Sequence, residues 1–152
     1  MIKKLLIANR GEIAIRVART AAAMGIRTVA VHTADDVTSL HLKHTDEVRE
    51  LPGKGVAGYL SIDALVRIAQ TTGSDAVHPG YGLLSERADF AAACETAGLI
   101  FVGPNAETLR RQGDKVLARV LAVDAGVPVL NSSDPVASAA ETHTFFDAQG
   151  AA

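Results

Sequence analysis

The chain has 152 residues, of which 48% are hydrophobic and 21% charged, and this fits one soluble domain with a sizeable core. Its formal net charge of −2 gives no broad basic field, so we expect no nucleic-acid partner. No apolar run approaches the roughly 20 residues that a membrane span needs, so we expect no membrane partner either.

Short β-like runs alternate with helical stretches along the chain. The first run, residues 4–8, is apolar and short, as a buried parallel strand is, and no small-residue cleavage site of a signal peptide follows it. A helix is predicted over residues 12–24, and Gly25 ends it. The apolar face predicted for this helix consists of Ile13, Val17, Ala21 and Met24, with Ala14 and Ala18 beside them.

The rest of the chain repeats this alternation. Residues 52–58, which hold three glycines, are predicted to form a loop. Further strands are predicted over residues 27–32, 46–51, 76–78 and 99–102. Further helices are predicted over residues 39–44, 61–73, 85–97, 106–111 and 114–124. The repeating βα order predicts an α/β fold, with a doubly wound, mostly parallel sheet and helices on both of its faces.

The composition changes at Val127, where a polar connector rich in Asn, Ser, Asp and Pro begins. We therefore expect one domain over residues 1–126, followed over residues 127–152 by this connector and one more helix. Phe145 and Phe146 on that helix need a partner to bury them. We expect the segment that carries them to find little support in the first domain.

Cys94 is the single cysteine, so the chain cannot form an internal disulfide. This usage suits a reducing compartment, and we expect a cytoplasmic protein. Because Cys94 lies in an alanine-rich helical run, we expect it to be buried as a packing residue.

The loop Asn9-Arg10-Gly11-Glu12 follows the first predicted strand and opens the first helix. Ligands of open parallel sheets bind outside the carboxyl ends of the strands, and a helix amino terminus attracts anions. The loop lacks the three spaced glycines of the dinucleotide fingerprint, which argues against a nicotinamide dehydrogenase. An anion site and a bracing role for Arg10 and Glu12 both remain open.

The loop after the fourth predicted strand reads His78-Pro79-Gly80-Tyr81-Gly82-Leu83-Leu84-Ser85-Glu86. Two glycines free the backbone around Tyr81 and leave its ring at the rim of the sheet. Such a ring either stacks on a flat ligand or packs against the domain, and position alone favours packing. His78 is a candidate pH-sensitive group, although a hydrogen-bonded structural role fits its position better.

Lys115 follows Gly113 and Asp114 at the start of a predicted helix. A lysine in such a place can reach a phosphate group as a mobile point charge. From position alone, a solvated surface lysine is the simpler interpretation.

Four motifs occur in order along the chain, and together they resemble the amino-terminal domain of biotin carboxylase. They are residues 7–14 (Ile-Ala-Asn-Arg-Gly-Glu-Ile-Ala), 78–86, 101–104 (Phe-Val-Gly-Pro) and 113–115 (Gly-Asp-Lys). The same domain opens acetyl-, propionyl- and methylcrotonyl-CoA carboxylases and pyruvate carboxylase. The resemblance covers about residues 2–130 and implies a Rossmann-like domain that precedes an ATP-grasp domain.

The resemblance implies an ATP-dependent ligase. Biotin carboxylases use MgATP and bicarbonate to form carboxyphosphate, and then carboxylate N1 of biotin on a carrier domain. By resemblance, Tyr81, Gly82 and Leu83 would contact the biotin, with Tyr81 against its ureido ring. Lys115 would contact an ATP phosphate. Family members often have Phe at the position of Leu83, so this chain keeps an apolar wall there without a ring.

The partners implied by the resemblance are a biotin carboxyl carrier domain, a carboxyltransferase domain or subunit, and a second copy of the chain. In the bacterial enzyme, two arginines and an acidic residue of the first helix contribute to a homodimer. Arg16 and Arg19 match those arginines, whereas Ala23 stands at the acidic position.

By the same resemblance, residues 136–149 correspond to the first helix of the ATP-grasp lid. The family's Mg²⁺-binding glutamates, its bicarbonate-binding residues and its catalytic base have no match in these 152 residues. We therefore assign no catalytic residue and no metal ligand, and expect no ATP turnover from the 152 residues alone. Two alternatives remain open: another ATP-grasp ligase, such as carbamoyl-phosphate synthetase, and a non-catalytic assembly module.

Overall fold

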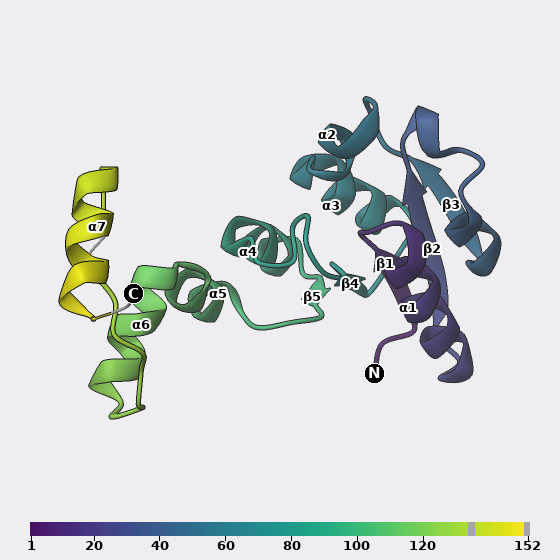
Figure 1. The fold of residues 1–152 in the computed structure, drawn as a ribbon. Helices are drawn as coiled ribbons and strands as arrows, with labels where there is room; N and C mark the ends of the chain where they lie inside the picture. Colours follow the sequence, from purple (N-terminus) through teal and green to yellow (C-terminus); the bar gives the residue numbers. More distant parts are fainter. Residues whose placement is uncertain (134–135, 151–152) are drawn as a thin grey trace. The chain divides into compact units, whose positions relative to one another are not determined.

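A five-stranded sheet organises the first part of the chain in the computed structural model, which describes residues 1–133 and 136–150 (Figure 1). Its strands are β1 (Lys4–Ile7), β2 (Arg27–His32), β3 (Glu47–Glu50), β4 (Ala76–His78) and β5 (Ile100–Phe101). The order across the sheet is β3-β2-β1-β4-β5, and every pair of neighbours is parallel. The predicted α/β class with a parallel, doubly wound sheet is confirmed.

Helices connect the strands and continue beyond the last of them. The α-helices are α1 (Gly11–Ala23), α2 (Gly55–Tyr59), α3 (Ile62–Thr71), α4 (Ala88–Thr96), α5 (Ala106–Gly113), α6 (Lys115–Asp124) and α7 (Ala139–Ala148). Two short 3₁₀ helices, η1 (Ala34–Asp36) and η2 (Leu40–His44), lie between β2 and β3. Among the described residues, no helix is long and apolar enough to cross a membrane.

The core divides into two clusters, one on each face of the sheet. Leu5, Ile7 and Ala76 point to the face that α1 covers. Leu6 and Val77, one position along, point to the opposite face, where they belong to the cluster that includes α3, α4 and α5. This division follows from the period of two along a strand, because successive side chains point to opposite faces.

Helix α1 buries the small residues of its predicted apolar face more fully than the large ones. Its buried residues are Ala14, Ala18 and Ala21. Val17 is half-buried and packs against the cluster on this face of the sheet, and Ile13 is also half-buried. Met24 is 68% exposed, so the prediction is wrong for Met24. Small alanines let the helix backbone approach the sheet closely, and the larger side chains beside them then line a cavity at its edge.

The predicted loop over residues 52–58 is also wrong in part, because α2 begins at Gly55. Gly58 is buried in this helix, and a Cβ atom placed on it would lie 2.4 Å from the Thr33 methyl carbon. The glycine therefore permits close packing of α2 against the residue after β2. The sequence pattern instead indicated a loop at Gly58, where the conformational freedom of glycine would be used.

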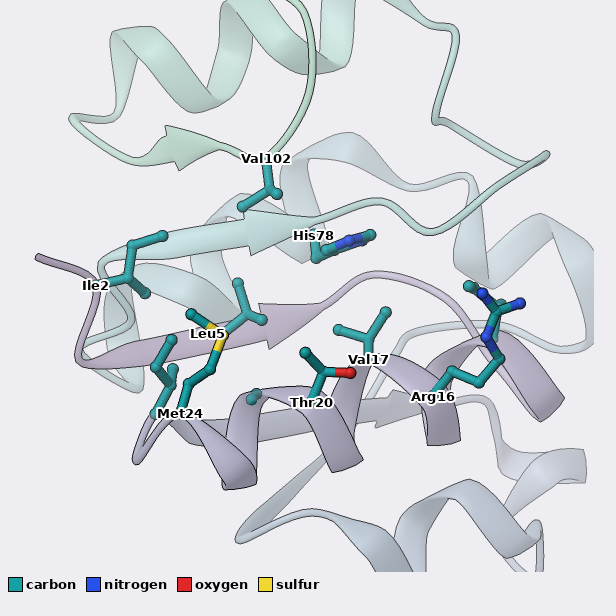
Figure 2. Close-up of a pocket in the computed structure, with 11 residues that line it drawn as sticks. Ile2, Leu5, Arg16, Val17, Thr20, Met24, His78 and Val102 are labelled. Carbon is teal, nitrogen blue, oxygen red and sulfur yellow. The ribbon is translucent and has the colours of Figure 1, made fainter.

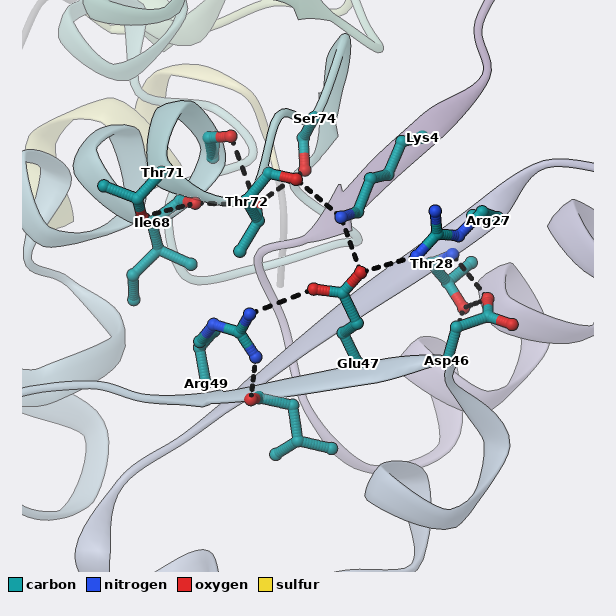
Figure 3. A network of polar contacts seen from close by, with 12 residues as sticks. Lys4, Arg27, Thr28, Asp46, Glu47, Arg49, Ile68, Thr71, Thr72 and Ser74 are labelled. Atoms are coloured by element: carbon teal, nitrogen blue, oxygen red, sulfur yellow. Dashed lines mark hydrogen bonds and ion pairs between the residues drawn. The ribbon is translucent and has the colours of Figure 1, made fainter.

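A polar network ties the edge strand β3 to β1 and β2 (Figure 3). The Glu47 carboxylate lies 2.6 Å from the Lys4 ammonium, 2.7 Å from the Arg27 guanidinium and 3.0 Å from the Arg49 guanidinium. The hydrogen bond from Lys4 and the three positive charges lower the pKa of Glu47. Charged side chains on an edge strand also disfavour pairing with another chain.

The described chain separates into two compact units, residues 1–115 and residues 116–152. This division precedes the expected boundary at residue 126, and a natural domain boundary there stays a prediction. In the second unit no residue of α7 is buried, and Phe146 is 52% exposed while its ring packs edge-on against Phe145. Residues 134–135 of the predicted connector and residues 151–152 lie outside the described residues.

Candidate functional site at the β1 and β4 carboxyl ends

The loops after β1 and β4 meet at the point where the strand order reverses. The chain passes from β1 to β2 and β3 on one side, and from β4 to β5 on the other, so β1 and β4 are neighbours. Open parallel sheets bind ligands at such switch points, because the connections leave there in opposite directions. The structure thus brings together two loops that stand about 70 residues apart in the sequence.

Asn9 joins these loops through its side-chain amide. Its Nδ2 atom donates to the Pro79 carbonyl at 2.7 Å and to the Tyr81 carbonyl at 2.9 Å. Its Oδ1 atom accepts the Arg10 backbone N–H at 2.9 Å. Asn9 is only 4% exposed, and both polar atoms of its buried amide are hydrogen-bonded. Sequence reasoning placed Asn9 in the right loop and gave it no role.

We call residues 79–83 the Tyr81 loop, and side chains from both strand ends hold it. The Nδ1 atom of His78 accepts the Gly80 backbone N–H at 3.0 Å. The Tyr81 hydroxyl donates to the Glu12 carboxylate at 3.2 Å, and Arg16 contacts the other oxygen of Glu12 at 3.3 Å. Burial lowers the pKa of His78, which favours the neutral ring that accepts the Gly80 hydrogen bond.

The backbone of the Tyr81 loop takes the left-handed conformation at three positions. The φ angles are +69° at Gly80, +61° at Gly82 and +41° at Leu83, the last being the one positive φ of a non-glycine residue in the described chain. Tyr81 stands between them with its side chain 60% exposed. A large aromatic ring therefore lies open to solvent at the rim, which excludes the packing role that position alone favoured.

Arg10 belongs to a second cluster that also includes Asp36 and Tyr59. Its guanidinium lies 5.5 Å from the centre of the Tyr59 ring and 3.5 Å from the Asp36 carboxylate. The Tyr59 hydroxyl donates to the same carboxylate at 2.8 Å. Burial of Tyr59 and this bond to Asp36 raise the pKa of the phenol. The cluster gives Arg10 a bracing role, one of the two roles left open for it.

An apolar cavity of about 450 Å³ runs along α1 on its face of the sheet (Figure 2). Arg16 lies at the end of this cavity nearest the strand carboxyl ends, and Met24 lies toward the other end (Figure 2). The remaining lining residues are Ile2, Leu5, Ile13, Val17, Thr20, Ala21, Ile26, His78 and Val102. The cavity explains why the large residues of α1 are not fully buried.

The other predicted site residues lie on the surface. Lys115 is exposed and is the first residue of α6. The Gly113 that precedes it lies beside the chain that follows the Tyr81 loop, because a Cβ atom on Gly113 would be 3.6 Å from the Glu86 carbonyl oxygen. Arg16 and Arg19 are exposed on α1, and Arg16 is already paired with Glu12 on the same helix.

Comparison with known proteins matches residues 1–109 to the family described as "Biotin carboxylase, N-terminal domain". Mouse mitochondrial pyruvate carboxylase is 51% identical over 153 residues, an alignment that covers 98% of this chain and 13% of the mouse protein. The biotin carboxylase of Halalkalibacterium halodurans is 52% identical over 135 residues, covering 88% of this chain and 30% of the bacterial one.

Solved structures give the same result. The biotin carboxylase domain of a single-chain bacterial carboxylase superposes with a TM-score of 0.90 at 50% identity, covering 99% of this chain and 35% of that one. A complete pyruvate carboxylase from Rhizobium etli superposes with a TM-score of 0.81 at 48% identity, over 86% of this chain and 13% of that one. The 152 residues therefore span a minor part of each of these relatives.

Proposed function

The chain belongs to the biotin carboxylase N-terminal domain family, and on that premise we propose that it forms one wall of the active site of a biotin carboxylase. The observation that carries the proposal is the Tyr81 ring, exposed at the strand switch point and anchored by Glu12. The complete enzyme would be an ATP-dependent ligase within a biotin-dependent carboxylase, with its catalytic residues outside these 152 residues.

The residues present fit a wall for biotin. The ureido ring of biotin is flat, and the open face of Tyr81 offers a surface on which such a ring stacks. Gly82 leaves the approach open, since a Cβ atom there would meet no atom within 4 Å, and the half-buried Leu83 adds an apolar contact. Bound biotin would supply the ureido nitrogen that accepts the carboxyl group.

Lys115 is the residue that we propose for contact with ATP. The exposed ammonium of Lys115 would hold a phosphate by charge, and no step of phosphoryl transfer is assigned to it. Mg²⁺ would be bound mainly by residues of the ATP-grasp region. Arg16 and Arg19 are proposed for a dimer contact, for which Arg16 must exchange its pairing with Glu12.

The proposed partners are a biotin carboxyl carrier domain and a carboxyltransferase domain or subunit. One of the similar structures is described as a single-chain, multi-domain long-chain acyl-CoA carboxylase, which supports an assembly of this kind. A cytoplasmic location is proposed as well, because the buried, unpaired thiol of Cys94 suits a reducing compartment.

A chimaeric enzyme tests the proposal. Residues 1–133 of this chain replace the corresponding N-terminal residues of the Halalkalibacterium halodurans biotin carboxylase, and biotin- and bicarbonate-dependent ADP release is measured. We expect activity within about tenfold of the parent enzyme, because the two sequences are 52% identical where they align. A folded chimaera without biotin-dependent ADP release would contradict the proposal and favour an assembly role.

A further inference from the structure

We propose that Asn9 is a positioning residue for the Tyr81 loop, and that Glu12 completes this role by holding the Tyr81 hydroxyl. The inference rests on the proposed function of Tyr81 in biotin binding. The two residues lie on the β1 side of the switch point. They are not proposed to contact biotin themselves, and they act through the Tyr81 loop, which is proposed to contact it.

The Tyr81 loop needs such support because its own sequence leaves it a choice of conformations. Glycine adopts left-handed and right-handed backbone about equally, so Gly80 and Gly82 impose no direction on Tyr81. Leu83 at φ +41° is in a region that L side chains rarely adopt. Contacts from outside the loop must therefore select this conformation over those in which Leu83 relaxes.

Asn9 supplies these contacts from a buried position. The two carbonyls it binds, those of Pro79 and Tyr81, converge on one amide nitrogen, so the chain between them must curl around Asn9. The third bond, from the Arg10 N–H to Oδ1, sets which end of the amide faces the loop. An aspartate at this position would keep that acceptor and would place a second oxygen against the two carbonyls.

Glu12 holds the other end of the same tyrosine. The Tyr81 backbone is bonded to Asn9 and its hydroxyl to Glu12, while the ring between these points is 60% exposed. A ring restrained at both ends offers its face to a flat ligand without losing further freedom on binding. Release of the restraint should therefore weaken biotin binding more than ATP binding.

The first experiment measures Asn9→Asp in the chimaeric enzyme described above. We expect the biotin KM to rise about tenfold or more, with the ATP KM changed less than about twofold. Asn105→Asp is the matched control, because the Asn105 side chain accepts the Thr108 N–H, which a carboxylate accepts equally well. If the chimaera with Asn9 is active and the Asn9→Asp variant has the same biotin KM, the positioning role is wrong while the proposed function stands.

The second experiment observes the loop itself in the 152-residue chain by amide hydrogen exchange. The Gly80 N–H of the loop is bonded to His78 at the end of β4, whereas the Leu6 N–H lies in the central strand. In Asn9→Asp we expect exchange at Gly80 to quicken about tenfold or more, with Leu6 unchanged. Equal exchange at Gly80 in both proteins would overturn the proposal without reference to any enzyme activity.

A third comparison serves if Asn9→Asp does not fold. Glu12 is on the surface, and Glu12→Ala removes the acceptor of the Tyr81 hydroxyl, while Glu12→Gln keeps a neutral acceptor at the same reach. In the chimaera we expect Glu12→Ala to raise the biotin KM about threefold and Glu12→Gln to restore it. Identical biotin KM values for both variants would count against the proposal.

Discussion

The side-chain amide of Asn9 occupies the space in which a Cβ atom on Gly80 would lie. That atom would be 2.5 Å from Nδ2 and 2.8 Å from the Cγ atom of Asn9, closer than real Cβ contacts come. The two residues are therefore a matched pair, one from each side of the switch point. A side chain at Gly80 must displace the amide that holds the loop.

Gly80→Ala should consequently destabilise the chain by about 2 kcal/mol or more, from left-handed backbone and the loss of Asn9 hydrogen bonds together. Gly82→Ala is the control, because Gly82 also has positive φ but a Cβ atom there meets nothing within 4 Å. It should cost only about 1 kcal/mol. Urea unfolding of the three proteins measures the difference, and equal losses would show that the Asn9 contact carries no weight.

The stability of the chain should fall as the pH drops below 6.5 because of His78. Burial lowers the pKa of His78 in the folded chain below the ordinary histidine value of 6.5. Between pH 6.5 and the folded pKa, the unfolded chain therefore binds more protons than the folded chain. The stabilisation is present above 6.5 and is lost as the pH falls through the folded pKa. Protonation of Nδ1 also removes the acceptor of the Gly80 N–H.

His78→Asn tests this, because it should flatten the dependence of Tm on pH below 6.5. His143→Asn, at an exposed histidine of α7, is the control for a histidine-to-asparagine substitution away from the Tyr81 loop. Thermal unfolding by circular dichroism from pH 7 downward supplies the data. If Tm falls with pH as steeply in His78→Asn as in the unchanged chain, His78 does not cause the pH dependence.

Lys115→Ala in the chimaeric enzyme should raise the ATP KM about tenfold, since a hydrogen bond to a charged group contributes about 1.5–3 kcal/mol. The biotin KM should change little. Lys43→Ala removes an exposed lysine of η2 and serves as the control for net charge. An ATP KM equal to that of the control would mean that Lys115 is only a solvated surface residue.

Cys94 should be unreactive toward thiol reagents until the chain unfolds. Its side chain is fully buried, and burial raises its pKa to about 11, so little thiolate forms at neutral pH. Titration with a disulfide reagent should detect no thiol in the folded chain and one per chain in denaturant. Rapid reaction in the native state would contradict the burial of α4 against the sheet.

The βα alternation predicted the sheet well because each strand is a short apolar run between turn residues, and the burial of Cys94 followed from its alanine-rich helix. The same periodicity located α1 but not its most buried residues, since hydrophobicity ranks Ile13 above Ala14, whereas close helix–sheet contact selects the smaller residue. Composition likewise could not distinguish a turn glycine from Gly58, where glycine is needed because Thr33 leaves no room for a Cβ atom.

The site was predictable as a location rather than as an arrangement. The predicted strand ends placed Asn9 and Tyr81 on the same rim of the sheet. The resemblance of the motifs to biotin carboxylase implied a ligand contact for Tyr81. The hydrogen bonds from Asn9 to the Tyr81 loop depend on two strands becoming neighbours, and no local pattern records that pairing. The contacts of Asp36 and Tyr59 with Arg10 were not predicted for the same reason, because they join three separate segments.

The central place of β1 in the sheet also sets an order of events during synthesis. The strand made first needs β2 on one side and β4 on the other, and residues 76–78 are among the last of the sheet to leave the ribosome. Until then one edge of β1 stays open and Asn9 has no carbonyls to bind. Such distant pairings form slowly, so the Tyr81 loop should be among the last parts of the first unit to reach its final form.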